Sequence, residues 1–183
     1  MASESKFVSE ALKIAQGVLK QPLSIERGAA LLYQITVDNQ LRLTVDPTKP
    51  SRGTSAFQTD LCVFEKKAED VKIPRMVMEF KTGITTHDIL TYSTKAKKHK
   101  EVYPYLRYGV IASEISNIPG RVFTHNESLD FFAAVSNMPL GKLKSFFAKL
   151  IRSEVKTSRL LEAITFGSRT TRLFRTEIKL YRT

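Results

Sequence analysis

The stretches Thr-Asp-Leu-Cys-Val-Phe (residues 59–64) and Met-Val-Met-Glu-Phe-Lys (residues 76–81) decide the expected fold. Each is short, apolar and bounded by polar residues, so each predicts a buried β-strand. Each also carries charge, and burying a charged group is costly unless it is paired or binds a metal. Because side chains alternate along a strand, Glu79 and Lys81 share one face, and Asp60 can reach that face from the neighbouring strand.

The rest of the chain divides into segments of helical or strand periodicity. Helical spacing of apolar residues predicts helices over residues 3–21, 24–35, 85–100, 127–136 and 140–165. Alternation or short apolar runs predict strands over residues 41–45, 57–65, 75–81, 106–112, 121–123 and 173–181, with a loop at 46–56. The first three of these strands are expected to form an antiparallel meander. This order predicts an α/β (α+β) fold, in which a central mixed β-sheet is flanked by helices.

Length and charge narrow the class of protein. A chain of 183 residues is long enough for one domain with a real core. We expect a single domain over residues 1–183, with its core at about 20–113 and a helical, basic part at 127–183. The net charge of +11 favours polyanionic partners, with nucleic acid first and an anionic membrane surface second.

Several classes of function are disfavoured by what the sequence lacks. Cys62 is the only cysteine, so an internal disulfide cannot form. The apolar stretches are shorter than a membrane span, and residues 1–6 do not resemble a signal peptide, so we expect a cytoplasmic protein with no membrane partner. The sequence contains no glycine-rich phosphate loop, so we expect no nucleotide cofactor.

A carboxylate followed two residues later by lysine occurs six times in the chain, and the surrounding elements distinguish these occurrences. Only Glu79 and Glu177 stand on predicted apolar strands. Glu177 has no acid-bearing strand just before it and no helix after it, whereas Glu79 has both. The pair Glu79 and Lys81, together with Asp60, is therefore the strongest candidate for a chemical site.

At these positions the chain resembles the PD-(D/E)xK phosphodiesterase superfamily, whose members share the restriction-endonuclease-like fold. Asp60 starts one strand, Glu79-Phe80-Lys81 ends the next, and helices are expected before and after the hairpin. The resemblance covers about residues 20–113, and it departs from the family pattern at Thr59, where a proline is typical. It implies a Mg²⁺-dependent endonuclease that hydrolyses phosphodiester bonds of DNA, in a restriction or repair setting.

The resemblance also implies roles for individual residues. Asp60 and Glu79 would be metal ligands, joined by the backbone carbonyl of Phe80, and Lys81 would lie beside the attacking water. Carboxylate oxygens are the hard ligands that Mg²⁺ prefers, and Mn²⁺ is expected to substitute for it. Many family members place another acid on the helix before the sheet. Glu26 is favoured over Glu10 for that role, although an acid in the first turn of a helix also has a purely structural explanation.

Basic residues around the predicted hairpin are candidates for contacts with phosphates. The helix after Lys81 carries the densest basic run in the chain, and the loop before Asp60 adds one arginine. The candidate nucleic-acid contacts are Arg52, Lys95, Lys97, Lys98 and Lys100. A solvated, dipole-favoured helix end explains these lysines equally well.

Other interpretations of the same residues stay open. Asp60 and Lys81 could form a cross-strand ion pair with Glu79 exposed at the end of its strand. The chain could be a non-catalytic nucleic-acid-binding or assembly protein with a nuclease-like fold, or its substrate could be RNA. Cutting both strands of a duplex usually takes two sites, which would favour a homodimer.

Overall fold

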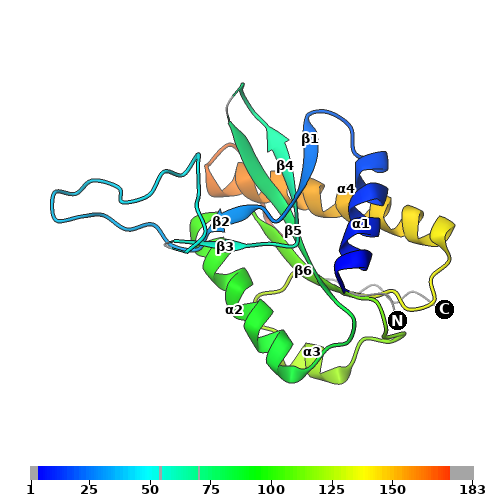
Figure 1. The fold of residues 1–183 in the computed structure, drawn as a ribbon. Helices are drawn as coiled ribbons and strands as arrows, with labels where there is room; N and C mark the ends of the chain where they lie inside the picture. The colour runs from blue at the N-terminus through cyan, green and yellow to red at the C-terminus, as the bar shows by residue number, and fades with distance from the viewer. Residues whose placement is uncertain (1–3, 54, 70, 174–183) are drawn as a thin grey trace.

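A mixed five-stranded sheet forms the centre of the molecule (Figure 1). The computed structural model describes residues 4–173 except residues 54 and 70. The sheet order is β1-β4-β5-β6-β7, with bounds Leu23–Arg27 (β1), Leu61–Lys66 (β4), Lys72–Lys81 (β5), Arg107–Ala112 (β6) and Phe131–Ala134 (β7). β1, β4 and β5 pair antiparallel, whereas β6 and β7 continue the sheet parallel to β5. The predicted α/β class with a mixed, helix-flanked sheet is therefore confirmed.

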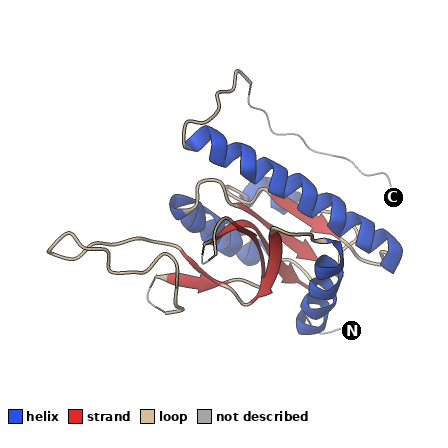
Figure 2. Cartoon of the chain, turned by 90° about the horizontal axis from the view of Figure 1, so that it is seen from above, coloured by secondary structure: helices blue, strands red, loops and turns tan. Residues whose placement is uncertain are grey.

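Helices cover both faces of this sheet (Figure 2). α1 (Glu4–Val18) and α4 (Leu140–Thr165) pack on one face, over the even-numbered side chains of β5 such as Met78 and Phe80. α2 (Thr86–Val102) packs on the other face, over Val77 and Tyr108, with α3 (Gly120–His125) beside it. Within the described residues, no helix is both long and apolar enough to cross a bilayer.

Local sequence explains most of these elements. The helices predicted over 3–21, 85–100 and 140–165 correspond to α1, α2 and α4, and the strands predicted over 57–65, 75–81 and 106–112 overlap β4, β5 and β6. α2 begins with a capping box, in which Thr85 and Asp88 each bond the other's backbone amide. The strand predicted over 173–181 lies outside the described residues apart from Leu173, which has no regular structure.

The segment predicted as a helix over residues 24–35 is extended instead. It forms β1 and β2 (Ala30–Leu32), which lie on either side of Gly28. The φ of Gly28 is 69°, a left-handed conformation that glycine adopts without strain. The helix prediction is wrong because Gly28 breaks the helical pattern and because β1 satisfies the backbone groups along the edge of β4.

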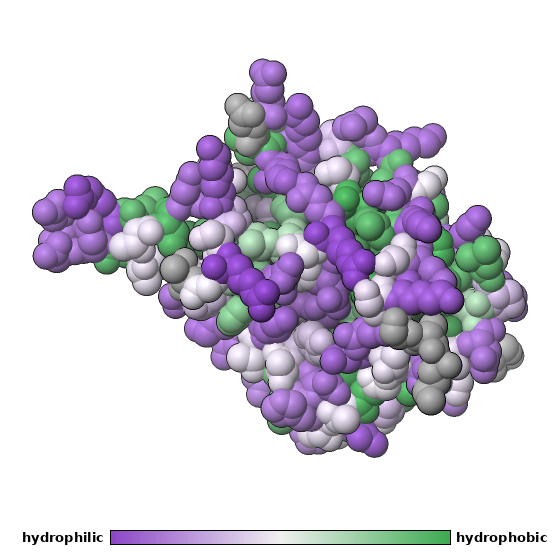
Figure 3. All heavy atoms as spheres, viewed as in Figure 1, coloured by the Kyte–Doolittle hydropathy of each residue, from purple (hydrophilic) through white to green (hydrophobic). Residues whose placement is uncertain are grey.

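The strand predicted over residues 41–45 is also wrong, because this segment belongs to an arm that extends away from the sheet (Figure 1). The arm connects β2 to β3 (Ala56–Gln58), its short partner strand. Leu41 is 84% exposed with a φ of 61°, and an isolated bridge between Val37 and Leu43 takes the place of a ladder. Alternation of apolar and polar residues predicts a strand only where one face of the strand can be buried. In the arm, the apolar residues stay exposed and form a hydrophobic band next to the hydrophilic tip of the arm (Figure 3).

Two further predictions, both after β6, are wrong: a predicted strand is a helix, and a predicted helix contains a strand. The strand predicted over 121–123 is α3, which follows Pro119, and the helix predicted over 127–136 contains β7. Short apolar runs fit either periodicity, and tertiary pairing decides between them. β7 packs tightly on β6, since a Cβ atom at Gly109 would lie only 2.3 Å from the ring of Phe131.

A buried ion network joins α4 to the sheet at the start of β5. The side chain of Arg75 is fully buried and lies 2.6 Å from Glu65 of β4 and 2.5 Å from Glu162 of α4. Arg159 of α4 approaches the other oxygen of Glu65 at 3.0 Å. Burial acts to raise the pKa of Glu65, but the Arg159 and Arg75 guanidiniums outweigh it and hold this pKa below its ordinary value.

Replacing Arg75 with methionine should destabilise the fold. The substitution keeps volume but leaves Glu65 and Glu162 without their buried partner, and breaking a buried pair costs about 3 kcal/mol or more. Urea unfolding followed by circular dichroism measures this loss. Lys98→Gln, which removes an exposed pair with Glu101, is the control, and its cost should stay below about 1 kcal/mol. Equal costs for the two variants would show that the network does not hold α4 to the sheet.

Candidate active site

Asp60 and Glu79 lie side by side because of the register between β4 and β5. Leu61 pairs with Met78 in this antiparallel ladder, so Asp60, one residue earlier, meets Glu79, one residue later. The Asp60 carboxylate accepts a 2.8 Å hydrogen bond from the backbone amide of Phe80. That bond fixes Asp60 at the end of the strand pair, on the face covered by α2.

Glu79 is a carboxylate held inside the protein. It is only 3% exposed, the Tyr108 hydroxyl donates a hydrogen bond to it, and the Lys95 ammonium lies 3.4 Å away. Burial raises the pKa of Glu79 above its ordinary value; Lys95 opposes this rise and the Asp60 carboxylate adds to it. A carboxylate that is buried beside a like charge and reached by a lysine is typical of functional sites.

Lys81 lies at the edge of the same face, where three elements meet. Its ammonium is 3.6 Å from Glu4 at the start of α1 and 3.9 Å from Asp88 in the first turn of α2. It also lies 5.9 Å from the centre of the Tyr92 ring. The alternative of an Asp60–Lys81 ion pair with an exposed Glu79 is therefore wrong, since Glu79 is buried and Lys81 pairs elsewhere.

The electrostatics of Tyr92 indicate how closely these acids gather. Burial raises the pKa of Tyr92 well above its ordinary value, and four nearby carboxylates raise it further: Glu79, Asp60, Glu4 and Asp88. Acids from α1, α2, β5 and the residue before β4 therefore lie around Tyr92, and the Lys81 and Lys95 ammoniums lie near its ring.

A groove of about 550 Å³ begins at Asp60 and runs beneath the base of the arm. Its cationic lining residues are Arg27, Arg52 and Lys95. The stacked rings of Tyr33 and Phe57, whose centroids are 4.0 Å apart, also line it. The groove therefore joins the carboxylate cluster to a surface that combines positive charge with aromatic rings.

Glu26 does not occupy the position predicted for it. It lies on β1 rather than on a helix, opposite Cys62, and its ion-pair partner is Lys72 at the start of β5. The candidate Glu10 is exposed on α1. Glu4, which precedes the sheet on the same helix, is the α1 acid that contacts Lys81.

The predicted nucleic-acid contacts separate into two groups. Arg52 and Lys95 line the groove with Asp60. Lys100 instead pairs with Asp130 at 2.7 Å and donates to the carbonyl of Ser128, and Lys98 pairs with Glu101. Lys97 is exposed on α2 and is not a lining residue of the groove. The helix turns its lysines to different sides, so the dense basic run is not one surface.

Sequence reasoning missed several residues of the site, among them Glu4, Arg27 and Tyr108. Tyr108 stands on the same face of β6 as Val110 and could have been suspected from strand alternation alone. Arg27, which donates to the hydroxyls of Ser5 and Ser9, fell inside a wrongly predicted helix. Glu4 opens the Glu-x-Lys pattern nearest the N-terminus, and no local signal connects it to β5.

The donor chemistry of the site suits a small divalent cation. Among the residues that the structure describes, no group of three or more histidine, cysteine, aspartate and glutamate side chains is arranged to hold a metal ion. Asp60 and Glu79 form a pair of carboxylates, and Mg²⁺ is commonly bound by one or two carboxylates with water completing its shell. A cation between them would offset the repulsion that raises the pKa of Glu79.

The chain matches no known protein-family model and no curated protein sequence.

Replacing Glu79 with glutamine should stabilise the protein at neutral pH. A carboxyl group whose pKa is raised by folding adds stability at acidic pH, and this contribution is lost as the pH rises through its folded-state pKa. Glutamine resembles the protonated form, so the free energy of unfolding should exceed the parent's at pH 7 to 8. The gain should vanish below the ordinary glutamate pKa of about 4.3.

Glu65→Gln is the matched control, with the opposite sign. Because the pKa of Glu65 is lowered by its guanidinium partners, its contribution is present above the ordinary value and is lost as the pH falls. This substitution should therefore destabilise the protein at neutral pH, and its cost should fade in acid. Urea unfolding across pH 3 to 8 measures both; a pH-independent difference for both variants would contradict the assignment.

Proposed function

We propose that the protein is a Mg²⁺-dependent endonuclease that hydrolyses phosphodiester bonds of DNA. The observation that carries this proposal is the carboxylate pair Asp60 and Glu79 at the head of a cationic groove. Acids alone would repel a phosphate, and cations alone would only bind it. Their combination suits a site that binds a phosphodiester and activates water against it.

Asp60 and Glu79 are the residues that would hold the ion. When bound, Mg²⁺ would supply Lewis-acid stabilisation of charge and a more acidic water. The bond from the Phe80 amide orients Asp60, and the Tyr108 hydroxyl orients Glu79. Both carboxylates are thus held in place before substrate arrives, which reduces the reorganisation that the reaction requires.

Lys81 and Lys95 supply positive charge where negative charge develops during hydrolysis. Lys81 is about a quarter exposed, so its ammonium can reach a phosphate at the surface of the site. Glu4 and Asp88, which flank Lys81, hold it in position. Lys95 faces both Glu79 and the groove, and so joins the reacting point to the binding surface. The proposed restriction-endonuclease-like relationship rests on these same positions.

A non-catalytic nucleic-acid-binding protein is the second candidate, and one observation favours it. Glu79 already has two partners, the Lys95 ammonium and the Tyr108 hydroxyl, so its carboxylate is satisfied without an ion. A protein that kept the fold but not the activity would show salt-sensitive binding and no turnover with Mg²⁺ or Mn²⁺. RNA as the substrate would be distinguished by comparing DNA and RNA strands of the same sequence.

Asp60→Asn and Lys81→Ala should each abolish cleavage of supercoiled plasmid DNA. Loss of one group that stabilises developing charge typically lowers the rate by about 10²- to 10³-fold. Cleavage by the parent should stop with EDTA and return with excess Mg²⁺ or Mn²⁺. Binding of a duplex, measured in EDTA, should stay within a few-fold of the parent for Lys81→Ala.

Two exposed residues provide matched controls. Glu10→Gln removes an acid from α1 away from Lys81, and Lys98→Ala removes a lysine of α2 that faces Glu101. Both should cut at the parental rate. If Asp60→Asn and Lys81→Ala also cut at that rate, the proposed activity does not belong to this site; if the parent binds but never cuts, the second candidate is correct.

A further inference from the structure

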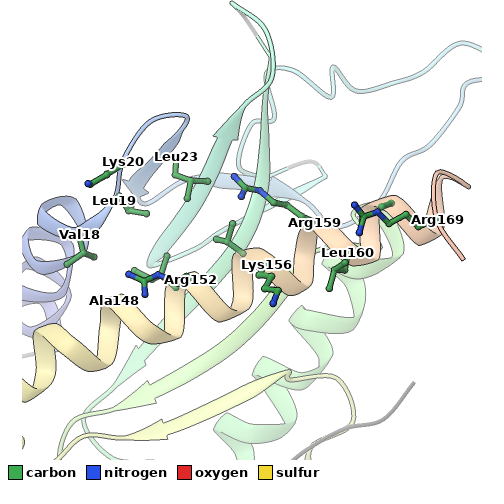
Figure 4. Close-up of a pocket in the computed structure, with 13 residues that line it drawn as sticks. Val18, Leu19, Lys20, Leu23, Ala148, Arg152, Lys156, Arg159, Leu160 and Arg169 are labelled. Carbon is green, nitrogen blue, oxygen red and sulfur yellow. The ribbon is translucent and has the colours of Figure 1, made fainter. Parts of the chain in front are cut away.

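A second groove, of about 670 Å³, lies between the carboxyl end of α1 and the middle of α4 (Figure 4). It is on the sheet face opposite α2, away from the carboxylate cluster. Its lining is partly apolar: Ile151 and Val155 are buried, whereas Val18 and Leu160 are exposed. Of the described residues that line it, all the charged ones are cations: Lys20, Arg152, Lys156, Arg159 and Arg169.

Among the described residues, four of these five cations have no acidic ion-pair partner. Arg159 pairs with Glu65, but within residues 4–53, 55–69 and 71–173 no ion pair joins an acid to any of the other four cations. The two acids of α4 are engaged elsewhere, Glu154 with Arg107 and Glu162 with Arg75. A concave surface with one sign of charge concentrates the opposite charge, so this groove attracts an anionic chain.

We propose that this groove binds the phosphate backbone of the same nucleic acid that the candidate active site would cleave. The inference rests on the proposed function, and it adds a second contact that supplies affinity without chemistry. Arg152, Lys156 and Arg159 follow one another on α4 at intervals of four and three residues, so they point to one side of the helix. They span about 10 Å, a length over which one strand of a B-form duplex carries about three phosphates.

Helix α1 sets the distance between the two sites. Glu4, its first residue, contacts Lys81, and Val18, its last, lines the groove. The helical rise places these ends about 21 Å apart, which corresponds to about six base pairs along a duplex. A nucleic acid that touches both sites must be at least that long, so a shorter ligand can occupy only one site at a time and should gain less affinity from the groove.

The test compares two double variants. The groove variant is Arg152→Gln/Lys156→Gln. The control is Lys142→Gln/Lys144→Gln, which removes the same charge from exposed residues at the start of α4, outside the groove. Binding is measured in EDTA by fluorescence anisotropy, with a 30-base-pair duplex and with a hairpin whose stem has four base pairs. We expect the groove variant to bind the long duplex at least tenfold more weakly at 0.15 M salt, with a salt slope reduced by about two. Its affinity for the hairpin, which is too short to contact both sites at once, should fall by a clearly smaller factor.

Three results would overturn the inference. Equal losses in the two variants would show an effect of net charge alone, and equal losses for both ligands would show that the groove is not a remote contact. Retained duplex binding with loss of binding to phosphatidylserine vesicles would assign the groove to a membrane. Lys20→Gln/Arg169→Gln, which alters the groove outside α4, provides an independent variant, and thermal unfolding checks that each variant is folded.

These outcomes are separable from the test of the proposed activity. The binding measurements need no metal and no turnover, so their results are valid even if the parent does not cleave DNA. Conversely, if the groove variant binds the long duplex as tightly as the parent while Asp60→Asn alone loses cleavage, the proposed function stands and the groove has no role in it.

Discussion

The antiparallel register between β4 and β5 is the constraint on which the candidate site depends. Leu61 opposite Met78 places these two apolar side chains beneath α1 and α4, and the same pairing sets Asp60 beside Glu79 under α2. A one-residue slip would turn every side chain of the strand to the other face. The two carboxylates therefore cannot separate without dismantling the core, which holds two like charges together despite their repulsion.

The environments of the buried carboxylates near the two ends of β5 shift their pKa values in opposite directions. Near its start, Arg75 is matched by Glu65 and Glu162, and the pKa of Glu65 is lowered. Near its end, Glu79 lies beside another acid, and its pKa is raised. A network of opposite charges such as that of Arg75 suits structural stability, whereas two adjacent acids, of which only Glu79 is paired with a lysine among the described residues, repel each other at a place where another cation can be accepted. The contrast within one strand is a physical reason to look for chemistry at the second end.

The sequence could predict features that depend on residues close together in the chain, but not those that depend on contacts between distant residues. Glu79 and Lys81 could be placed on one face because strand alternation is local, and the capping box of α2 is local too. Glu4 could not be placed, since its carboxylate lies 3.6 Å from the Lys81 ammonium in space but precedes the predicted core in sequence, far from Lys81. β1 was mistaken for a helix because its strand character comes from pairing with β4, a non-local contact.

The net charge of +11 is distributed unevenly, and this separates affinity from chemistry. At the candidate site, Lys81 and Lys95 are interleaved with acids, so a phosphate gains little from approaching it without a cation. In the α1/α4 groove, the described part of the chain supplies an acidic partner to Arg159 alone of the five lining cations. On the proposed function, the groove would hold a nucleic acid in the absence of metal, and the carboxylate pair would accept a phosphate only after a divalent ion had offset its charge. Binding energy gained at the remote surface could then orient the strand at the reacting one.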